Sequence, residues 1–167
     1  MKDTILDQEY KSDTFYVRPV NGEDKELFKG VVAAENIMGK IYNIMPEIAL
    51  DSYWSVFIND EEDLNYSVFL NDGTFIGRVA LQGINKGYPE LAIILIKEYQ
   101  GQGLGYRLLM QWLNWVYESL GYKRILVKVD STNKKSLGLF NKIAVKVSEA
   151  DITEYYIDLP ISISCGN

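Results

Sequence analysis

One segment near the middle of the chain constrains the fold more than any other. Residues 91–96 read LAIILI without a polar side chain, and the glycine-rich KEYQGQGLG then precedes an amphipathic stretch that begins at Leu104. An apolar run of this length predicts a strand buried on both faces. Apolar residues at helical spacing then predict a helix that ends at Gly121. The segment therefore predicts a buried strand, a tight turn and a helix.

The turn between that strand and helix has glycine at alternate positions, Gly101, Gly103 and Gly105. Successive N–H groups that open a helix suit an anion such as phosphate or pyrophosphate. A dinucleotide-binding fold requires Gly-x-Gly-x-x-Gly, which fails in both registers, and a phosphate loop requires Gly-Lys-Ser/Thr, whereas Tyr106 follows Gly105. The alternatives that remain are another kind of anion site and a strand-to-helix connection without a ligand.

The rest of the chain supplies strands and helices on both sides of this segment. We expect strands at 14–20, 124–129, 144–148 and 154–159, a hairpin at 66–84 around Asn71-Asp72-Gly73, helices from Asn21 to 37 and from Asn133 to Lys142, and a helical stretch at 41–58 broken at Pro46. This order predicts an α+β fold with a mixed, mostly antiparallel central sheet flanked by helices. The length predicts a single domain over 1–167, with an N-terminal arm of about residues 1–13.

The composition excludes several kinds of site. The chain has no histidine, and its one cysteine, Cys165, is third from the end. Sites that need Ser-His-Asp, Cys-His, a His-ligated metal or an internal disulfide are therefore excluded, and we expect no metal. The N-terminus lacks the apolar run of a signal peptide, so we expect a cytoplasmic protein. We also expect neither a membrane nor a nucleic acid as partner.

Charge is distributed unevenly along the chain. Residues 1–63 hold 14 acidic and 6 basic side chains, whereas residues 123–146 hold seven basic side chains and the single acid Asp130. Solvated faces explain such runs in many proteins. The alternative is that one end of the molecule binds an anion and the other a cation.

Two elements of the sequence resemble the GNAT acetyltransferase superfamily. The stretch ELAIILIKEYQGQGLGYRLL (90–109) is similar to its acetyl-CoA signature, Gln/Arg-x-x-Gly-x-Gly/Ala after a buried strand, and NKKSLGLFNKI (133–143) is similar to its second element. The resemblance covers roughly residues 14–159. It implies a GNAT-like acyl-CoA N-acyltransferase fold, with acetyl-CoA (coenzyme A) as co-substrate. The implied activity is N-acetylation of a primary amine of a small molecule or peptide, by direct attack in a ternary complex.

The resemblance also implies which residues bind the cofactor. Backbone groups of Ile93, Ile94 and Leu95 would hold the pantetheine arm, and N–H groups of the glycine turn would hold the pyrophosphate. Asn133 would contact the pantetheine, and Lys134 or Lys135 the 3′-phosphate. The expected cofactor site comprises Ile93, Ile94, Leu95, Gln100, Gly101, Gln102, Gly103, Leu104, Gly105, Tyr106, Asn133, Lys134 and Lys135.

The sequence departs from the family pattern at the positions that serve catalysis. Phe140 stands where many members have a tyrosine that protonates the leaving thiolate, Lys128 where some have a glutamate base, and Ala144-Val145 where Gly-Phe is usual. A thiol has an ordinary pKa of about 8.5, so a thiolate can leave without a proton donor. A backbone N–H of residues 93–95 would stabilise the oxyanion.

An amine nucleophile must lose a proton, which favours a carboxylate as general base. We expect Glu90, which opens the buried strand, to be this base, with Glu35 and Asp51 as alternatives. A non-catalytic acyl-CoA-binding sensor or regulatory module is the rival interpretation, favoured by Phe140 and Lys128. Transfer of a longer acyl group and a homodimer also remain open.

The acidic excess of residues 1–63 favours a cationic amine as the acceptor, because a negative cleft would concentrate it. Tyr42, Tyr53 and Trp54 could add cation–π contacts to such an acceptor or pack in the core.

Overall fold

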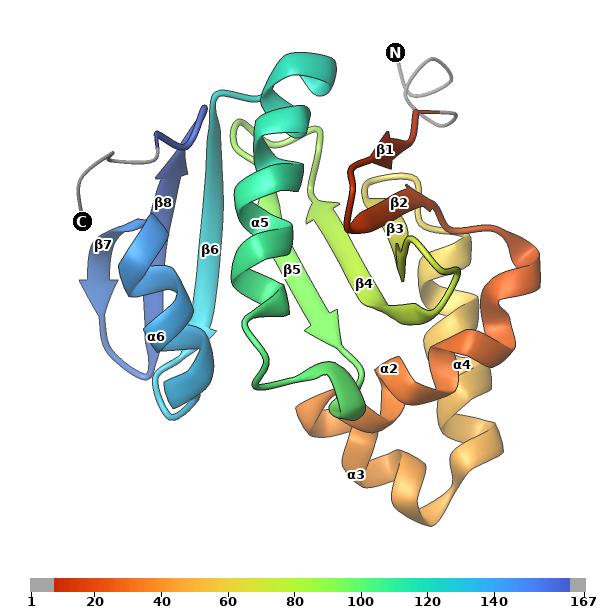
Figure 1. Cartoon of the computed structure of the whole chain (residues 1–167). Coiled ribbons are helices and arrows are strands. Elements are labelled where there is room, and N and C mark those ends of the chain that lie inside the picture. Colours follow the sequence, from red (N-terminus) through yellow and green to blue (C-terminus); the bar gives the residue numbers. More distant parts are fainter. Residues whose placement is uncertain (1–7, 163–167) are drawn as a thin grey trace.

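The computed structural model describes residues 8–162, and its centre is an eight-stranded sheet (Figure 1). The strands are β1 (Tyr10–Lys11), β2 (Phe15–Pro19), β3 (Leu64–Leu70), β4 (Phe75–Gln82), β5 (Glu90–Leu95), β6 (Arg124–Asp130), β7 (Val145–Glu149) and β8 (Ile152–Asp158). They lie in the order β1-β2-β3-β4-β5-β6-β8-β7. Every neighbouring pair is antiparallel except β5 and β6. The predicted mixed, mostly antiparallel sheet is confirmed.

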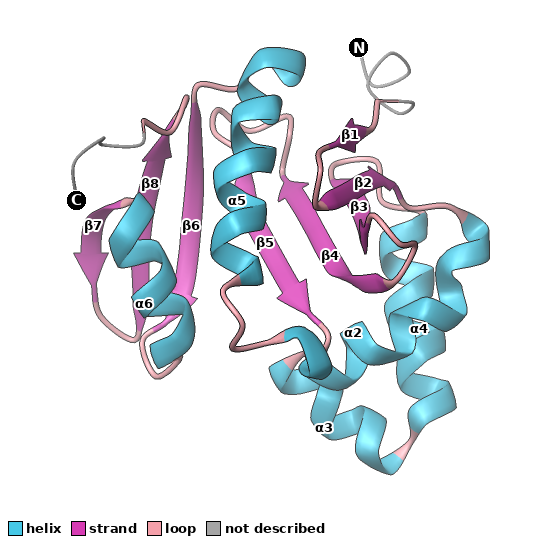
Figure 2. Cartoon of the chain, viewed as in Figure 1, coloured by secondary structure: helices cyan, strands magenta, loops and turns pink. Residues whose placement is uncertain are grey.

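Helices flank this sheet (Figure 2). They are the 3₁₀ helix η1 (Gly22–Phe28), α2 (Lys29–Ala34), α3 (Asn36–Ile44), α4 (Pro46–Ile58), the 3₁₀ turn η2 (Lys97–Tyr99), α5 (Leu104–Trp115), its π-helical continuation η3 (Val116–Leu120) and α6 (Lys134–Ile143). In Figure 1, α5 and α6 lie in front of the strands and α2–α4 gather beyond the lower end of β4. No helix of residues 8–162 is both long and apolar enough to cross a bilayer.

Alternation along the strands separates two apolar clusters. On the α5 side, Leu108, Leu109 and Trp112 are fully buried in one cluster with residues of β3, β4, β6 and β8. A second cluster, built around Phe28 and Phe57, joins η1, α2 and α4 to the other face of the sheet. The two clusters thus hold helices against opposite faces of the same sheet.

Local signals in the sequence set several boundaries as expected. Asn21 and Asp24 form a reciprocal capping box at the start of η1. Pro46 is the first residue of α4, directly after the end of α3, so the helical stretch is broken there. Gly73 has a φ of 91° in the β3–β4 hairpin, and Gly121, with φ 79°, ends the long helix.

The prediction that the apolar strand is buried on both faces is wrong. Within β5 only Leu91 is fully buried, and the other five residues are half-exposed. The reason is that β5 and β6 pair at a single position, Glu90 with Leu126, and then diverge. Without a neighbour on that edge, the apolar residues after Leu91 border an open cleft.

The N-terminal arm proves partly structured. Tyr10 and Lys11 form β1, which pairs with β2. The remainder of the expected arm, residues 1–7, and the expectation for Cys165 lie outside the described residues.

Candidate active site

A cleft of about 1120 Å³ opens where β5 and β6 diverge. We call its two sides the loop wall and the helix wall. The loop wall consists of β5 residues 93–95, the glycine turn 100–106 and the start of α6 at residues 133–136. The helix wall consists of residues 34–36 at the α2–α3 junction and Arg78 of β4.

The loop wall has main-chain groups of β5 that no strand engages. The N–H of Ile96 donates to Ile76 of β4 at 2.9 Å, so by strand alternation the main chain of Ile94 also faces β4. The main chains of Ile93 and Leu95 then face the gap towards β6. The main chain of Ile93 and the N–H of Leu95 are therefore suited to pair with an extended ligand, whereas the main chain of Ile94 pairs with β4.

The glycine turn is built for a close approach to its backbone. Gly101 and Gly103 have φ of 73° and 77°, and no heavy atom lies within 4 Å of where a Cβ would stand on either. Gly103 is the N-cap of α5, and the first helical hydrogen bond runs from the N–H of Arg107 to its carbonyl at 3.2 Å. The N–H groups of 104–106 consequently have no helical acceptor and form a site for an anion.

A side chain ties this turn to the strand before it. Gln100 Nε2 donates a hydrogen bond to the Leu95 carbonyl oxygen at 2.8 Å. Gln102, in contrast, does not line the cleft and donates to the Glu98 carbonyl at 2.8 Å. Gln100 therefore fixes the spacing between the turn and β5.

The start of α6 adds positive charge to the loop wall. Asn133 is the N-cap of α6, and its side-chain oxygen accepts from the N–H of Ser136 at 3.2 Å, which leaves its amide NH₂ and one lone pair of the oxygen for a ligand. Lys134, Lys135 and Lys142 line the cleft, and Lys142 Nζ lies 5.7 Å from the ring centre of Tyr106. An anion in this part of the cleft would meet several cations.

The helix wall carries a carboxylate in an unusual position. Glu35 stands in an extended conformation between α2 and α3, and its Oε2 is shut off from solvent and has no hydrogen-bond partner among residues 8–162. Burial raises the pKa of Glu35 above its ordinary value, and the positive charge of Arg78 opposes this. A buried oxygen that lacks a donor is costly unless a ligand supplies one.

Two other carboxylates were candidates for the general base. Glu90 lines the cleft, and its Oε2 lies 3.8 Å from Lys128 Nζ across the β5–β6 pairing. Asp51 is an exposed partner of Lys25, at 2.6 Å, and does not line the cleft. The structure thus brings Glu90 and Glu35 to one cleft and leaves Asp51 outside it.

The acidic excess of the N-terminal region is not gathered around the cleft. Among its described acids, Glu35 is the one that lines the cleft, while others such as Asp24, Glu26 and Asp51 pair with nearby bases elsewhere. The aromatic residues Tyr42, Tyr53 and Trp54 pack in the second apolar cluster. The charge argument for a cationic acceptor therefore rests on Glu35 rather than on the whole region.

The structure gathers most of the predicted site. Apart from Gln102 and Leu104, every residue expected to bind the cofactor lines the cleft, as does Glu90. Sequence reasoning missed Arg78 and Lys142. A single arginine inside a hairpin of apolar residues was a signal that could have drawn attention to Arg78, because charged side chains in such strands are rarely buried.

Comparisons with known proteins agree with this arrangement. A family model described as acetyltransferase (GNAT) domain matches residues 15–146. Spermidine N(1)-acetyltransferase from Escherichia coli strain K12 is 26% identical over 113 residues, which are 66% of this chain and 60% of that protein. The match thus spans about three fifths of the length of this curated relative.

Solved structures show the same fold. A spermidine N-acetyltransferase chimera from Vibrio cholerae and hSSAT superposes with a TM-score of 0.71 and 21% identity, covering 88% of this chain and 96% of that one. Spermidine N-acetyltransferase from Vibrio cholerae in complex with CoA and spermine gives a TM-score of 0.67 with 18% identity, covering 88% and 96%.

Proposed function

Because this chain belongs to the GNAT acetyltransferase family, we propose that it is an N-acetyltransferase that moves the acetyl group of acetyl-CoA to a primary amine. The observation that carries the proposal is the divergence of β5 from β6 beside the glycine turn. It leaves the main chain of Ile93, the N–H of Leu95 and the start of α5 open to one cleft. An extended arm that ends in a pyrophosphate fits these two features together.

The residues of the loop wall fit acetyl-CoA. We assign the pantetheine arm to Ile93, Leu95 and the amide of Asn133, the pyrophosphate to the N–H groups of the glycine turn, and the 3′-phosphate to Lys134 or Lys135. Lys142 adds a further cation to the same wall. Acetyl-CoA supplies a thioester whose acetyl group is activated for transfer.

The chain's own groups then prepare the amine. Glu35 binds the incoming ammonium through its carboxylate, which is half-buried, lines the cleft and forms no ion pair with the described residues. Glu90 takes the proton, directly or through a water, so that the amine can attack as a neutral nucleophile. A main-chain N–H of Ile93 or Leu95 stabilises the oxyanion. Phe140 lines the cleft and cannot donate a proton, so the thiolate leaves without one from this position.

We propose a linear polyamine as the acceptor. Relatives of this chain bear the name spermidine acetyltransferase, and one solved relative holds spermine. Glu35 provides one anionic site for such a chain within the cleft. The protein is expected to act in the cytoplasm, where both substrates occur, and a homodimer remains a prediction.

The test is an acceptor screen with detection of both thiol release and acetylated product. Spermidine, butylamine and 4-aminobutyrate carry the same kind of primary amine next to a positive, a neutral or a negative remainder. We expect spermidine to be the best of the three. Release of thiol with none of them, in a protein that binds acetyl-CoA, would favour the non-catalytic binding module.

Two variants separate the roles of the carboxylates. Glu90→Gln should lower kcat about 100-fold, the size of a general-base contribution. Glu35→Gln should raise the KM for spermidine about tenfold, since it removes a charge-assisted hydrogen bond of about 1.5 kcal/mol. Glu47→Gln is the matched control, because Glu47 is exposed on α4 and does not line the cleft. Full activity in Glu90→Gln would remove Glu90 as the base and leave the acetyltransferase assignment intact.

A further inference from the structure

A buried arginine lines the same cleft as the unpaired carboxylate of the helix wall. Arg78 lies in the middle of β4, between Ser67 of β3 and Ile94 of β5, and only 6% of its surface is exposed. It lines the cleft. Buried guanidinium groups ordinarily pair with a carboxylate, yet Arg78 forms no ion pair with any carboxylate of residues 8–162.

The guanidinium of Arg78 is held by a neutral side chain. Its Nε and Nη2 donate to the amide oxygen of Asn65 at 3.1 and 2.6 Å, and it lies 5.8 Å from the ring centre of Phe57. An amide oxygen satisfies two donors but brings no negative charge. The charge of Arg78 also acts on the carboxyl group of Asp63, where it opposes the burial that raises the pKa, but the two form no ion pair. Asn65 therefore orients Arg78 without neutralising it.

Glu35 is the carboxylate of the helix wall on which this charge acts. Burial raises the pKa of Glu35 and the charge of Arg78 opposes that rise. The other titratable group beside it is the Tyr53 hydroxyl of α4, whose pKa burial raises, so it stays neutral. Without Arg78, a carboxyl group enclosed in this way would take up a proton more readily and lose its attraction for an ammonium group.

We propose that Arg78, oriented by Asn65, is a positioning residue that keeps the Glu35 carboxylate charged and unbonded for the ammonium group of the acceptor. The separation of the two charges is essential to this role, because a direct ion pair would occupy the carboxylate that the acceptor needs. The inference rests on the proposed function, since it assigns Glu35 to the incoming amine.

The charge of Arg78 also affects how tightly the ammonium group of the acceptor binds at each pH. Arg78 repels cations as well as supporting Glu35, so removal of its charge has two opposite effects on ammonium binding. When Glu35 is ionised in both proteins, loss of Arg78 leaves affinity unchanged or improves it. When the pH falls, loss of Arg78 lets Glu35 protonate earlier and weakens affinity. The affinity curves of the two proteins should therefore cross.

The experiment measures spermidine affinity for the protein–CoA complex by calorimetry from pH 5 to pH 8, where the primary ammonium group stays protonated. In the wild type, affinity should fall only near the acidic end. In Arg78→Gln the fall should begin at a higher pH, with an affinity at pH 8 equal to or tighter than that of the wild type. Arg78→Lys restores the charge and should return the curve to that of the wild type.

Further variants test whether the shift of the affinity curve depends on Arg78 and Glu35. Arg124→Gln removes an exposed arginine that pairs with Asp158 outside the cleft, and it should leave the curve in place. Glu35→Gln should abolish the pH dependence. If Arg78→Gln fails to fold, Asn65→Ala takes its place, because it keeps the charge of Arg78 but removes the side chain that orients the guanidinium. In Asn65→Ala the fall in affinity should move to higher pH by a smaller amount.

Two outcomes would overturn the inference. Parallel curves, with Arg78→Gln weaker by the same factor at every pH, would mean that Arg78 only supports the fold. An unchanged curve in both Arg78→Gln and Asn65→Ala would mean that it does not act on Glu35. Failure of the wild type to acetylate any amine would instead refute the proposed function, which the acceptor screen reports separately.

Discussion

The loop wall of the cleft offers main-chain N–H groups, whereas the helix wall offers two side-chain charges, of which Arg78 is buried and Glu35 half-buried. On the loop wall, Gly101 and Gly103 expose the backbone, and the start of α5 is open to an anion. On the helix wall, Glu35 and Arg78 come from elements that are more than forty residues apart in the chain. The first wall depends on local conformation, and the second depends on the packing of η1 and α2–α4 against the sheet.

Because of this difference, the two walls should be disrupted by different kinds of substitution. A backbone site fails when a side chain blocks it, and it tolerates changes elsewhere in the fold. A site made of side chains from distant elements fails when those elements shift, because its charges then lose their relative positions. The predictions below test the two walls separately.

The largest expected effect is on the anchoring of the helix wall. Arg18 donates to both carboxylate oxygens of Asp24 at 2.8 Å, and Ser67 Oγ donates to Asp24 at 2.8 Å, which ties η1 to β2 and β3. Asp24→Asn leaves Arg18 without its partner. We expect it to lower the free energy of unfolding by about 3–5 kcal/mol, as for other broken buried pairs, measured by urea denaturation at pH 7.

The role of Asp24 also predicts how the free energy of unfolding changes with pH. Burial raises the pKa of Asp24, but hydrogen bonds from Arg18, the Asn21 N–H and Ser67 outweigh it, so the pKa lies below its ordinary value. A carboxyl with a depressed pKa stabilises the fold above its unfolded pKa, and this stability is lost as the pH falls through the folded pKa. The wild type should lose more stability than Asp24→Asn between pH 5 and pH 3. Equal losses would mean that Asp24 does not anchor the wall through its charge.

The next largest effect concerns the backbone of the loop wall. Gly103→Glu places a carboxylate where the N–H groups of the turn meet the anion, and we expect acetyl-CoA affinity to fall at least about 100-fold by calorimetry, which is about 2.7 kcal/mol. Gly73→Glu is the matched control, because Gly73 is also left-handed, with open space around its Cβ position, but lies in the β3–β4 hairpin. Both variants carry a similar backbone strain of about 1–2 kcal/mol. Normal affinity in a folded Gly103→Glu protein would refute the assigned site.

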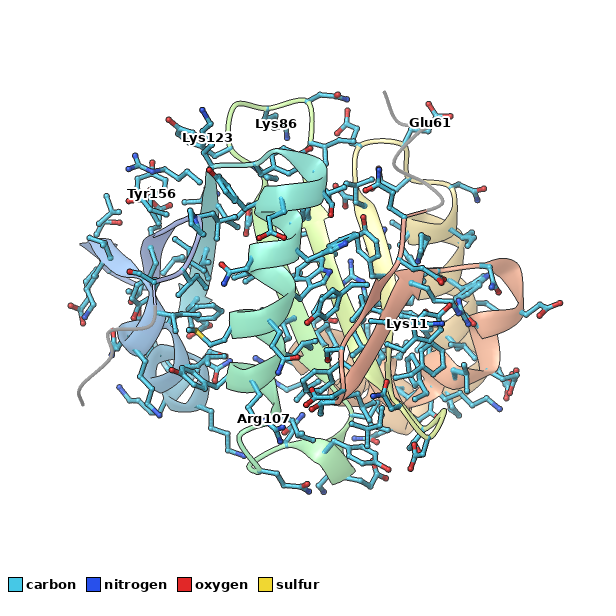
Figure 3. All side chains as sticks on the ribbon, turned by 45° about the horizontal axis from the view of Figure 1, so that its top comes forward. Lys11, Glu61, Lys86, Arg107, Lys123 and Tyr156 are labelled. Atoms are coloured by element: carbon cyan, nitrogen blue, oxygen red, sulfur yellow. The ribbon has the colours of Figure 1, made fainter. Side chains whose placement is uncertain are left out.

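The smallest effect is expected from exposed lysines. Lys134→Ala with Lys135→Ala should weaken CoA binding up to about fivefold, in the range of exposed charge pairs, and less at high salt. Lys123→Ala is the control, because Lys123 belongs to the same basic segment but does not line the cleft. Figure 3 shows Lys123 and Arg107 at opposite ends of the molecule, and Arg107 directly follows the glycine turn. Equal affinity of the wild type for CoA and dephospho-CoA would argue against a 3′-phosphate contact.

The sequence by itself determined the features that depend on near neighbours in the chain. The Asn71-Asp72-Gly73 turn, the Asn21 cap and Pro46 each fix a boundary through local backbone geometry, and all appear where expected. The glycine turn and the Asn133 cap belong to the same class, because their conformations follow from residue type. The sequence alone therefore predicted most of the residues of the loop wall, and their role in binding the cofactor stays a prediction.

Only the tertiary structure decided what happens at the edge of β5 and on the helix wall. An apolar hexapeptide cannot reveal that its neighbour pairs with it once and then turns away, so the strand was expected to be buried on both faces. The position of the acidic side chains could not be predicted either. The number of acidic residues in 1–63 does not show that, among the described ones, Glu35 is the one that lines the cleft. Arg78 and Glu35 line one cleft because sheet register and helix packing bring their elements together. Such pairing across space follows from the whole fold rather than from any single stretch of sequence.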